Sequence, residues 1–364
     1  MTGSFRSEGV GSLLRPPTLL EARVQHGHGD LDDESFKLIE DLAVQEAIAL
    51  QEHCGLDVIT DGELRRRSWA SHFVESFEGF GPLRGGVRMP WRGNGPEPTG
   101  LGARPVVVER LRWRRSMCAE EWTFVRAATR STAKVTLVSA QSASGFYDRV
   151  QSAGAYPTYD AYCADIVDLL RQQVSELARL GCRYIQLDAP QYGALVDEEL
   201  RETLRRDGRD PDRMIDSGIE MDNAIIDGFP GVTFGLHICR GNARGLYFGS
   251  GDYAPIARVF QRSHFQRFLL EYDDDRSGTF APLACLPDDR TAVLGLVTTK
   301  SGRLEDPSEV VGRIREATAV VPAERLALSP QCGFASMMEG NPLTAQEQQR
   351  KLELVVRVAN EVWG

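Results

Sequence analysis

Eight short apolar runs, each separated from the next by an amphipathic segment, constrain the fold of this chain more than any other feature of its sequence. Each run has the length of a strand and is rich in Val, Ile, Leu, Phe or Tyr. Such runs are typical of parallel strands that are buried on both faces. In chain order they are VGSLL, DVITDGE, KVTLVSA, YIQLDAP, TFGLHIC, RFLLEYD, AVLGLVTTK and LALSPQCGF.

Segments with helical spacing lie between these runs. Apolar residues recur at helical spacing in residues 158–181, and Gly181 stands where this helix would end. Asp306 and Thr344 are suitable N-caps for two later helices. Strand and helix alternating eight times is the pattern of parallel strands surrounded by helices. We therefore predict an α/β fold, a (β/α)8 TIM barrel, that spans residues 1–364 as a single domain.

One segment interrupts this alternation. Residues 64–130 lie between the second and third runs and include the Gly- and Pro-rich stretch RGGVRMPWRGNGPEPTGLGARP. A connection of this length far exceeds the usual βα loop of about two to six residues. We predict a long insertion, built from a β-hairpin and a helix, that lies over the barrel mouth as a wall or lid. A surface insertion remote from any site is the alternative.

Charge and cysteine usage disfavour several classes of protein. The chain has 42 Lys and Arg against 52 Asp and Glu, a formal net charge of -10, which disfavours a nucleic acid partner because phosphates need a basic face. No apolar run has the length of a membrane span, and the first residues lack the apolar core of a signal peptide. The seven cysteines are scattered without a CxxC motif, which suits reduced thiols. We expect a cytoplasmic protein without a membrane partner, and the sequence leaves open whether it forms a homo-oligomer.

In a barrel of this kind, the side chains at the carboxyl ends of the strands meet at one mouth. His237 and Cys239 end the fifth run, and they point to the same side because they are two residues apart in a strand. Glu271 lies in the sixth run and Cys332 lies near the end of the eighth. One imidazole, two thiolates and a carboxylate form a tetrahedral ligand set that suits Zn²⁺. Other polar residues at the strand ends are Ser12, Asp61, Glu63, Asp188 and Lys300.

A zinc ion held by two thiolates is electron-rich. It is a poor Lewis acid toward a carbonyl, but it binds a substrate thiol and removes the thiol's proton near neutral pH. The predicted reaction is attack of a substrate thiolate on an electrophilic carbon. Each ligand also has a structural interpretation: His237 as a strand-end histidine, Cys332 as a small buried residue, and Glu271 as the partner of Arg276.

The chain resembles the cobalamin-independent methionine synthase family, specifically the catalytic C-terminal barrel and the short, single-barrel branch. The resemblance rests on VGSLLRP, DGE, IQLDAP, HIC, LEYD and SPQCGF, which occur in this order. It implies a (β/α)8 barrel, zinc on the four ligands named above, and methyl transfer from a methyltetrahydrofolate to homocysteine.

The resemblance also implies roles at the mouth. Gly11 and Ser12 would contact the carboxylate of the amino acid, and Glu63 and Asp188 would hold its ammonium group. Two carboxylates that face a cavity suit a cationic group. The alternative is that these acids form salt bridges with the arginines at 65–67.

The chain departs from the large members of the family where the methyl donor would bind. A tertiary amine leaves only when it is protonated, so an acid must lie nearby. The family's histidine on the seventh strand is replaced near Thr299 and Lys300, so we name Lys300 and Asp61 as candidate proton donors. Phe146 and Tyr147 follow the third run without the tryptophan expected to stack on a folate.

Two other functions stay open at this point. The short branch also resembles epoxyalkane:coenzyme M transferase, in which a zinc-bound thiolate opens an epoxide. Glu63 and Asp188 favour an amino-acid thiol, whereas the arginines at 65–67, Arg240 and Lys300 would suit a sulfonate. A barrel with a purely structural metal is the third interpretation, although a large, well-cored domain gains little from such a site.

Overall fold

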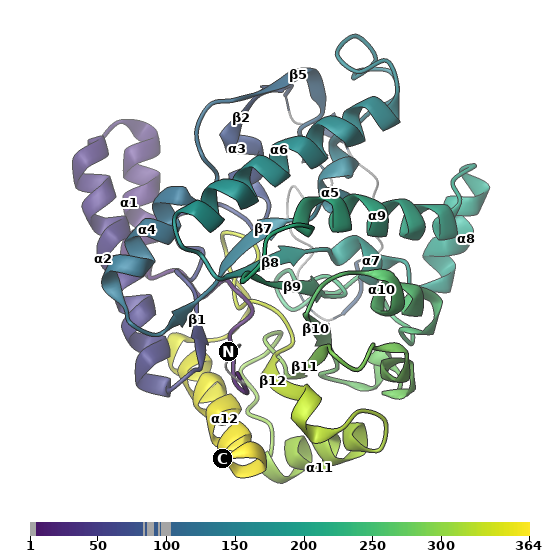
Figure 1. Cartoon of the computed structure of the whole chain (residues 1–364). Helices are drawn as coiled ribbons and strands as arrows, with labels where there is room; N and C mark the ends of the chain where they lie inside the picture. The colour runs from purple at the N-terminus through teal and green to yellow at the C-terminus, as the bar shows by residue number, and fades with distance from the viewer. Residues whose placement is uncertain (1–4, 83, 86–90, 94, 96–102) are drawn as a thin grey trace.

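The computed structural model describes residues 5–82, 84–85, 91–93, 95 and 103–364 (Figure 1). Most of the Gly- and Pro-rich stretch that we predicted to cover the mouth lies outside these residues. The described part contains a six-stranded sheet in the order β12-β11-β10-β9-β8-β7, with all neighbouring strands parallel. Its strands are β7 (Val135–Val138), β8 (Tyr184–Asp188), β9 (Thr233–Ile238), β10 (Arg267–Glu271), β11 (Thr291–Val297) and β12 (Leu326–Pro330). The α/β fold with a parallel sheet is thus confirmed.

Shorter pairings extend from both edges of this sheet. β1 (Val58–Ile59) pairs in parallel with β6 (Thr132–Ala133), which directly precedes β7. Isolated parallel bridges join Ser7 to Leu328 of β12 and Glu8 to Val58 of β1. The first extended pairing therefore lies at residues 7–8.

The prediction of a first strand at VGSLL, residues 10–14, was wrong by a few residues. The backbone there makes loop contacts in place of a ladder: Leu13 N donates to Gly62 O, and Phe334 N donates to Ser12 O. The small residues Gly11 and Ser12 let the chain approach its neighbours closely. A Cβ on Gly11 would lie 2.4 Å from Glu63 Oε1, which no real side chain tolerates.

Helices surround the strands, and Figure 1 shows α6 and α9 lying along the same side of β7 and β8. Asp306 and Thr344 cap their helices as predicted, and Gly181 has a φ of 89° after the end of α6. The longer helices are α1 (Pro17–His28), α2 (Asp33–Cys54), α4 (Ala119–Ala128), α6 (Tyr159–Arg179), α8 (Glu198–Arg206), α9 (Pro211–Ile226), α11 (Pro307–Thr318) and α12 (Ala345–Trp363). The shorter ones are α3 (Ser71–Ser76), α5 (Ala140–Ala143), α7 (Pro190–Ala194) and α10 (Ala257–Arg262). Within the described residues, no helix is both long and apolar enough to span a membrane.

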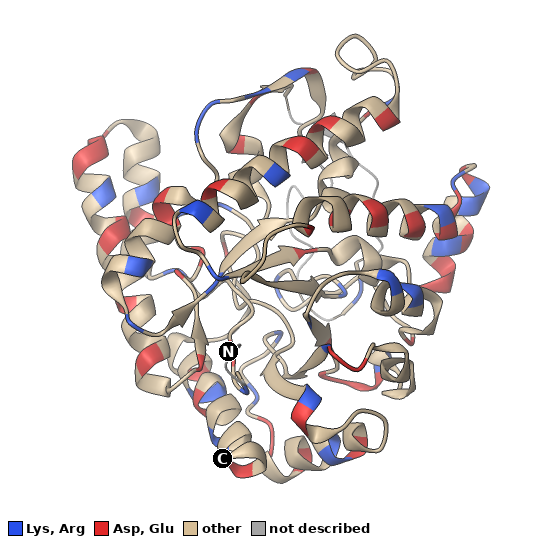
Figure 2. Cartoon of the chain, in the orientation of Figure 1, with Lys and Arg blue, Asp and Glu red and all other residues tan. Residues whose placement is uncertain are grey.

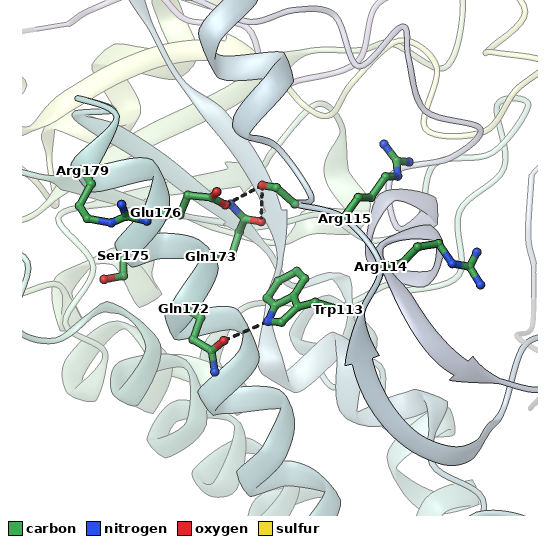
Figure 3. Close-up of a pocket in the computed structure, with 9 residues that line it drawn as sticks. Trp113, Arg114, Arg115, Gln172, Gln173, Ser175, Glu176 and Arg179 are labelled. Carbon is green, nitrogen blue, oxygen red and sulfur yellow. Dashed lines mark hydrogen bonds between the residues drawn. The ribbon is translucent and has the colours of Figure 1, made fainter. Parts of the chain in front are cut away.

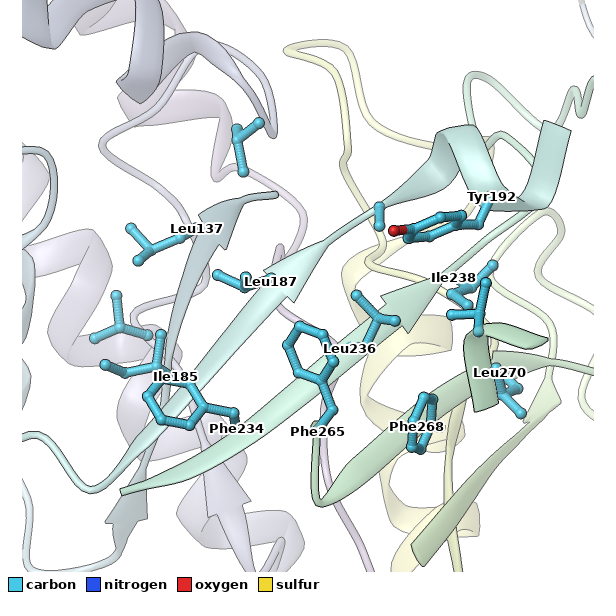
Figure 4. Close-up of a cluster of buried hydrophobic side chains, with 14 of the residues drawn as sticks. Leu137, Ile185, Leu187, Tyr192, Phe234, Leu236, Ile238, Phe265, Phe268 and Leu270 are labelled. Carbon is cyan, nitrogen blue, oxygen red and sulfur yellow. The ribbon is translucent and has the colours of Figure 1, made fainter. Parts of the chain in front are cut away.

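The main hydrophobic core lies between the sheet and the helices. Figure 4 shows Leu187, Leu236 and Phe268 among the side chains that the neighbouring strands β8, β9 and β10 direct into this layer. The opposite side of the strands carries a separate small cluster, made of Val10, Leu269, Val293 and Ala327. Because successive residues of a strand point to opposite faces, the two clusters mark the two sides of the sheet.

A cluster of buried charges lies at the amino ends of the strands. Glu8 is fully buried, and its carboxylate lies 2.6 Å from Lys134 Nζ and 2.7 Å from an Arg267 guanidinium nitrogen. The Tyr184 hydroxyl also donates to it at 2.8 Å. Burial raises the pKa of Glu8, but the charges of Lys134 and Arg267 outweigh that effect and lower it to about 2. We call these four residues the basal charge cluster.

Between β1 and β6 the chain forms short antiparallel pairs. β2 (Phe77–Phe80) pairs with β5 (Val107–Trp113), and β3 (Arg84–Gly85) pairs with β4 (Ala103–Arg104). Helix α4 follows and leads back to β6. These elements carry Arg104 toward the cavity described below.

Candidate metal centre

Three of the four predicted metal ligands come together at the carboxyl ends of the strands. The candidate ligand atoms of His237, Cys239 and Cys332 lie within 4.8 Å of one another, and all three residues are buried. His237 lies in β9 with Cys239 just beyond it, and Cys332 follows β12. Residues far apart in the sequence are thus gathered because parallel strands end on the same edge of the sheet.

Asp188 holds the ring of His237 in place. The register of β8 and β9 sets the two residues side by side, and His237 Nδ1 lies 3.0 Å from Asp188 Oδ1. Gln186 Nε2 donates to the same oxygen at 2.7 Å. This contact leaves His237 Nε2, a buried atom, without a hydrogen-bond partner among the described residues. A carboxylate on one ring nitrogen and a vacant second nitrogen is the usual arrangement of a metal-binding histidine.

The surroundings of Cys332 favour the ionised form of its thiol. Hydrogen bonding from Cys239 and the charge of His237 lower the pKa of Cys332 well below its ordinary value, although burial acts in the opposite direction. Burial lowers the pKa of His237, but its contacts with Asp188 and Cys332 outweigh burial and raise it to about 10. The ionised sulfur is the form of cysteine that binds a metal ion.

A chain of polar side chains supports Cys332. Ser336 Oγ lies 3.7 Å from Cys332 Sγ, and Asn242 Nδ2 lies 3.4 Å from the same hydroxyl oxygen. Asn341 Nδ2 in turn donates to Asn242 Oδ1 at 2.8 Å. Because an ionised Cys332 sulfur cannot donate, the serine hydroxyl is the donor of this pair when the thiol is deprotonated. Sequence reasoning missed these residues, since Asn and Ser in loops carry no motif.

Glu271, the fourth predicted ligand, is not part of the three-residue cluster. Its Oε1 lies 2.9 Å from Lys300 Nζ and 2.6 Å from an Arg276 nitrogen, and its Oε2 accepts from the backbone of Arg240 at 2.8 Å. Burial raises the pKa of Glu271, but these cations outweigh it and lower the value to about 2. The structural interpretation, a pair with Arg276, therefore describes Glu271 in this structure.

The three gathered residues fit a soft or borderline metal ion. A vacant imidazole nitrogen and two sulfur atoms form the kind of donor set that Zn²⁺ prefers. A fourth position remains for Glu271, for water or for a substrate atom.

A cavity of about 1240 Å³ opens beside the metal ligands. The predicted substrate-binding residues Gly11, Ser12, Glu63 and Asp188 all line it, as do the three candidate ligands. Ser12 Oγ accepts from the backbone of Ala335 at 3.3 Å. The structure thus brings together the four predicted substrate residues and three of the four predicted metal ligands.

Glu63 is a buried carboxylate with an unusual environment. Burial raises its pKa to about 7, and the negative charge of Asp188 acts in the same direction, while Arg66 opposes it. Thr136 Oγ1 donates to Glu63 Oε1 at 2.8 Å, and an Arg66 nitrogen lies 3.7 Å from that oxygen. Of the arginines at 65–67, which were the alternative partners of Glu63, only Arg66 lies within 4.0 Å of Glu63 among the described residues. Arg66 lies closer to Glu121, at 2.7 Å.

The two predicted proton donors lie in different settings. Asp61 Oδ1 accepts from the backbone of Glu63 at 2.9 Å, and its buried Oδ2 has no partner among the described residues. Burial raises the pKa of Asp61 to about 6. Lys300 is paired with Glu271, and Thr299 is buried with its hydroxyl 2.6 Å from Gln331 Oε1. Neither Asp61 nor Lys300 is among the described residues that line the large cavity.

A second, smaller cleft of about 490 Å³ lies away from the metal ligands (Figure 3). Trp113 Nε1 donates to Gln172 at 2.9 Å on its floor. Figure 3 shows Arg114 directed away from this contact. The cleft lacks the converging, partly vacant polar atoms of the metal centre.

Comparison with known proteins assigns the chain to a family. The fold and the site define an α/β enzyme whose polar residues meet at the carboxyl ends of parallel strands, and the catalytic domain of cobalamin-independent synthases matches residues 6–240 and 268–361. The chain belongs to the cobalamin-independent methionine synthase family and is a methyltransferase. The sequence is 35% identical over 364 residues to the uncharacterized protein YxjH of Bacillus subtilis (strain 168), covering 99% of this chain and 95% of that protein. It is 25% identical to a methionine synthase of Saccharolobus solfataricus over 363 residues, covering 94% of this chain and 95% of that enzyme.

Solved structures agree with this assignment. A Listeria monocytogenes protein, provisionally assigned as a vitamin-B12 independent methionine synthase, aligns with a TM-score of 0.75 at 27% identity and covers 99% of this chain and 98% of its own. A B12-independent methionine synthase from Shewanella sp. W3-18-1 aligns with a TM-score of 0.76 at 20% identity, covering 98% and 97%. The second likeness is one of fold.

Proposed function

We propose that this chain is a zinc-dependent S-methyltransferase that moves a methyl group to the thiolate of homocysteine and forms methionine. The observation that carries this proposal is the vacant, buried Nε2 of His237 beside two thiols at the wall of a large cavity. A closed structural site would not need an adjoining cavity, which argues against a purely structural metal. The Shewanella structure holds selenomethionine, the selenium counterpart of the proposed product.

We also infer that the strands close into an eight-stranded barrel. The bridges from Ser7 to β12 and from Glu8 to β1, with β6 leading into β7, would complete a ring. Residues 64–130 would form the wall or lid of its mouth, because Trp91 and Arg104 of this segment line the cavity. The single-domain organisation follows from the same ring.

The cavity wall supplies complementary groups for an amino acid. Glu63 and Asp188 would hold the ammonium group of homocysteine, and Gly11 and Ser12 would meet its carboxylate. Asp188 would serve twice, because its Oδ1 already orients His237. Binding of a cation would favour the ionised form of Glu63, whose pKa is raised in the empty cavity.

The chemical step forms one bond and breaks another. Bound zinc would lower the pKa of the substrate thiol and so supply a thiolate near neutral pH. That sulfur attacks the methyl carbon of the donor, proposed to be a methyltetrahydrofolate, and the bond from carbon to N5 breaks. N5 keeps the electron pair and takes up a proton. Of the two candidate donors we favour Asp61, since Lys300 Nζ is held by Glu271. Asp61 does not line the large cavity, so its proton would have to reach N5 through a water molecule or a side chain between them.

The sulfonate alternative loses support in this structure. Arg65 lies 2.6 Å from Asp41, Arg66 lies 2.7 Å from Glu121, and Arg240 donates to Gly251 O at 2.5 Å. Lys300 is engaged by Glu271. These four cations are already occupied, and the fifth, Arg67, is exposed and does not line the cavity. The acids Glu63 and Asp188, in contrast, line the cavity.

Zinc-edge X-ray absorption with and without L-homocysteine tests the proposal. We expect zinc bound to two sulfur atoms, and one additional sulfur ligand when the thiol is added. A coenzyme M arm, run in parallel, tests the alternative thiol. Absence of zinc, or an unchanged zinc shell with homocysteine, would contradict the proposal. Formation of methionine from methyltetrahydrofolate then tests the donor separately.

A further inference from the structure

Arg15 is a buried arginine that lies between Ser12, on the cavity wall, and the start of α1 at Pro17. Only 6% of its surface is exposed. Other Lys and Arg residues lie on outer helices, for example along α8 and in the turn that follows it, where water surrounds their charges (Figure 2). Burial lowers the pKa of Arg15 to about 10, although the negative charge of Glu63 opposes this effect, so the guanidinium stays charged at neutral pH. A charge buried at this cost needs partners that repay it.

The partners of Arg15 are backbone oxygens of two segments that lie far apart in the sequence. Nε and Nη2 donate to Arg66 O at 3.2 and 2.8 Å, and Nη2 also donates to Glu63 O at 3.4 Å. Nη1 donates to Met337 O at 2.9 Å and to Ala335 O at 3.2 Å. The nitrogens of the planar guanidinium cannot move independently of one another. The side chain therefore fixes the position of one segment relative to the other.

The two segments that Arg15 joins both form walls of the large cavity. The first follows β1 and carries Glu63, and the second follows β12 and carries Cys332 and Ser336. Arg15 itself is not among the described residues that line the cavity. It therefore acts on a bound substrate only through the residues of these two segments.

Glu63 and Cys332 lack the support that strands give to the other residues of the site. Asp188 and His237 lie within β8 and β9, where the register of the two strands fixes them. Glu63 lies beyond its strand with a φ of 55°, in the left-handed region that residues other than glycine seldom adopt. The hydrogen bond from Arg15 to the carbonyl oxygen of Glu63 helps to retain this conformation.

The two segments also touch each other directly at the cavity wall. Trp69 N donates to Ser336 O at 2.9 Å, and Ser68 forms an antiparallel bridge with Met337. Loops joined at a single place can pivot about it. Arg15 supplies a second attachment, so the separation between the two segments is fixed.

We propose that Arg15 is a positioning residue that fixes the distance between Glu63 and Cys332 and so sets the length of the amino-acid thiol that the cavity accepts. This inference rests on the proposed function, which places the ammonium group of the substrate at Glu63 and its sulfur at the metal beside Cys332. An amino acid with one methylene fewer than homocysteine cannot reach both ends of a pocket of fixed length. Such a difference changes specificity by about 10- to 200-fold.

Calorimetric titration of the zinc-loaded full chain with L-methionine and S-methyl-L-cysteine tests this inference. The two probes differ by one methylene between the α-carbon and the sulfur, and neither has a free thiol that could remove the zinc. We expect the wild type to bind L-methionine about 10- to 200-fold more tightly. Arg15→Lys keeps the positive charge but loses the planar fork. The ratio of the two affinities should therefore fall about tenfold, toward equal binding, while zinc content stays at that of the wild type.

Arg325→Lys is the matched control, because Arg325 also binds backbone oxygens but does so at the amino ends of the strands. Its nitrogens donate to Arg290 O at 3.0 Å, Leu286 O at 3.1 Å and Pro287 O at 2.5 Å. Both lysine variants should lose stability in denaturant unfolding, but Arg325→Lys should keep the wild-type ratio of affinities. An unchanged ratio in Arg15→Lys, or an equal change in Arg325→Lys, would overturn the inference.

Gln348→Met decides the matter if Arg15→Lys does not fold. Gln348 Oε1 accepts from Leu14 N at 2.7 Å, so this variant loosens the backbone next to Arg15. The ratio of affinities should again fall, and an unchanged ratio would contradict the inference. Zinc-edge spectra with L-homocysteine are measured on the same samples. If the wild type gains no sulfur ligand, the proposed function fails; if it gains one while the ratio is the same in wild type and variants, only the role of Arg15 fails.

Discussion

Buried polar atoms at the amino ends of the strands have hydrogen-bond or ion-pair partners, whereas some of those at the carboxyl ends have none among the described residues. In the basal charge cluster, both oxygens of Glu8 are used by Lys134, Arg267 and Tyr184. At the carboxyl ends, His237 Nε2 and Asp61 Oδ2 are buried without a partner among the described residues. The amino ends of the strands thus carry a saturated network, and the carboxyl ends carry an incomplete one.

This difference separates structural from functional polar residues. A buried polar atom without a partner costs about 1–3 kcal/mol; such atoms also occur elsewhere among the described residues, for example on the ring of His72, but His237 Nε2 lies beside two thiols at a large cavity. Saturated charges at the amino ends fix the packing of the strands. The combination of an unpartnered ring nitrogen, two thiols and a cavity marks the carboxyl ends as the reacting site. Substitutions at either end test this difference.

Loss of a sulfur ligand should have the largest effect on function. Cys332→Ser and Cys239→Ser remove a soft donor from the three-residue cluster. We expect substoichiometric zinc by mass spectrometry and a loss of turnover that exceeds about 10- to 100-fold, the loss typical of a supporting residue. Cys163→Ser, on α6, is the control and should keep both. Full zinc content in Cys332→Ser would show that the cluster does not bind the metal.

Loss of the single carboxylate in the basal charge cluster should have the largest effect on stability. Glu8→Gln leaves the buried cations Lys134 and Arg267 without their acidic partner. Denaturant unfolding should show a loss of about 3–5 kcal/mol, while zinc content per folded molecule stays unchanged. Glu8→Gln combined with Lys134→Met should recover part of that loss. A change in zinc content without a change in stability would show that Glu8 supports the metal centre and not the packing of the strands.

Asp188 lies at the carboxyl ends of the strands, and its substitution should mainly lower the affinity for zinc. Asp188→Asn weakens the contact that orients His237, so zinc affinity should fall about 10- to 100-fold. Competition with a chromophoric chelator measures this. If zinc affinity is unchanged and only the KM for homocysteine rises, Asp188 holds the substrate alone and does not position the histidine.

The two ends should also respond to pH with opposite signs. Glu8 has a pKa lowered from 4.5 to about 2, so its contribution to stability is present above about pH 4.5 and is lost as pH falls through 2. Glu63 has a pKa raised from 4.5 to about 7, so the folded state is most stable below about pH 4.5 and loses stability as pH rises toward 7. Thermal unfolding of Glu63→Gln should show a flatter curve between about pH 5 and 8 and a higher Tm at the alkaline end. An unchanged slope would mean that Glu63 does not titrate there.

Sequence reasoning located strands and ligands better than it located side-chain partners. Seven of the eight apolar runs contain a strand, because parallel strands need continuous apolar sequence. The first run failed because Gly11 and Ser12 pack against Glu63 and Gly333, contacts that only the folded chain reveals. Glu271 shows the same limit: its position on β10 is predictable, but its choice between a metal and Lys300 depends on loops distant in the sequence.

The smallest predicted effect concerns Ser336, which is not a metal ligand but changes the charge on the sulfur of Cys332. Its hydroxyl accepts from Asn242 and donates to the ionised Cys332 Sγ, 3.7 Å away, and such a bond withdraws charge from a thiolate. Ser336→Ala should make Cys332 a stronger donor, which shifts the sulfur-to-metal charge-transfer band of the cobalt-substituted protein to lower energy. Zinc content should stay at that of the wild type, and turnover should change by less than about tenfold, since a single neutral hydrogen bond contributes about 1 kcal/mol.

A buried serine that does not contact the sulfur atoms provides the matched control for Ser336. Ser142 is buried, and its hydroxyl donates to the backbone oxygen of Asp188 at 3.1 Å. Ser142→Ala therefore removes a buried hydroxyl near the metal centre while the hydrogen bond to Cys332 stays intact. The charge-transfer band should keep its wild-type energy in this variant, because the charge on the thiolate is unchanged. An equal shift in both variants would show that the shift does not depend on the hydrogen bond from Ser336 to Cys332. The cause would then be a general change in packing at the carboxyl ends of the strands.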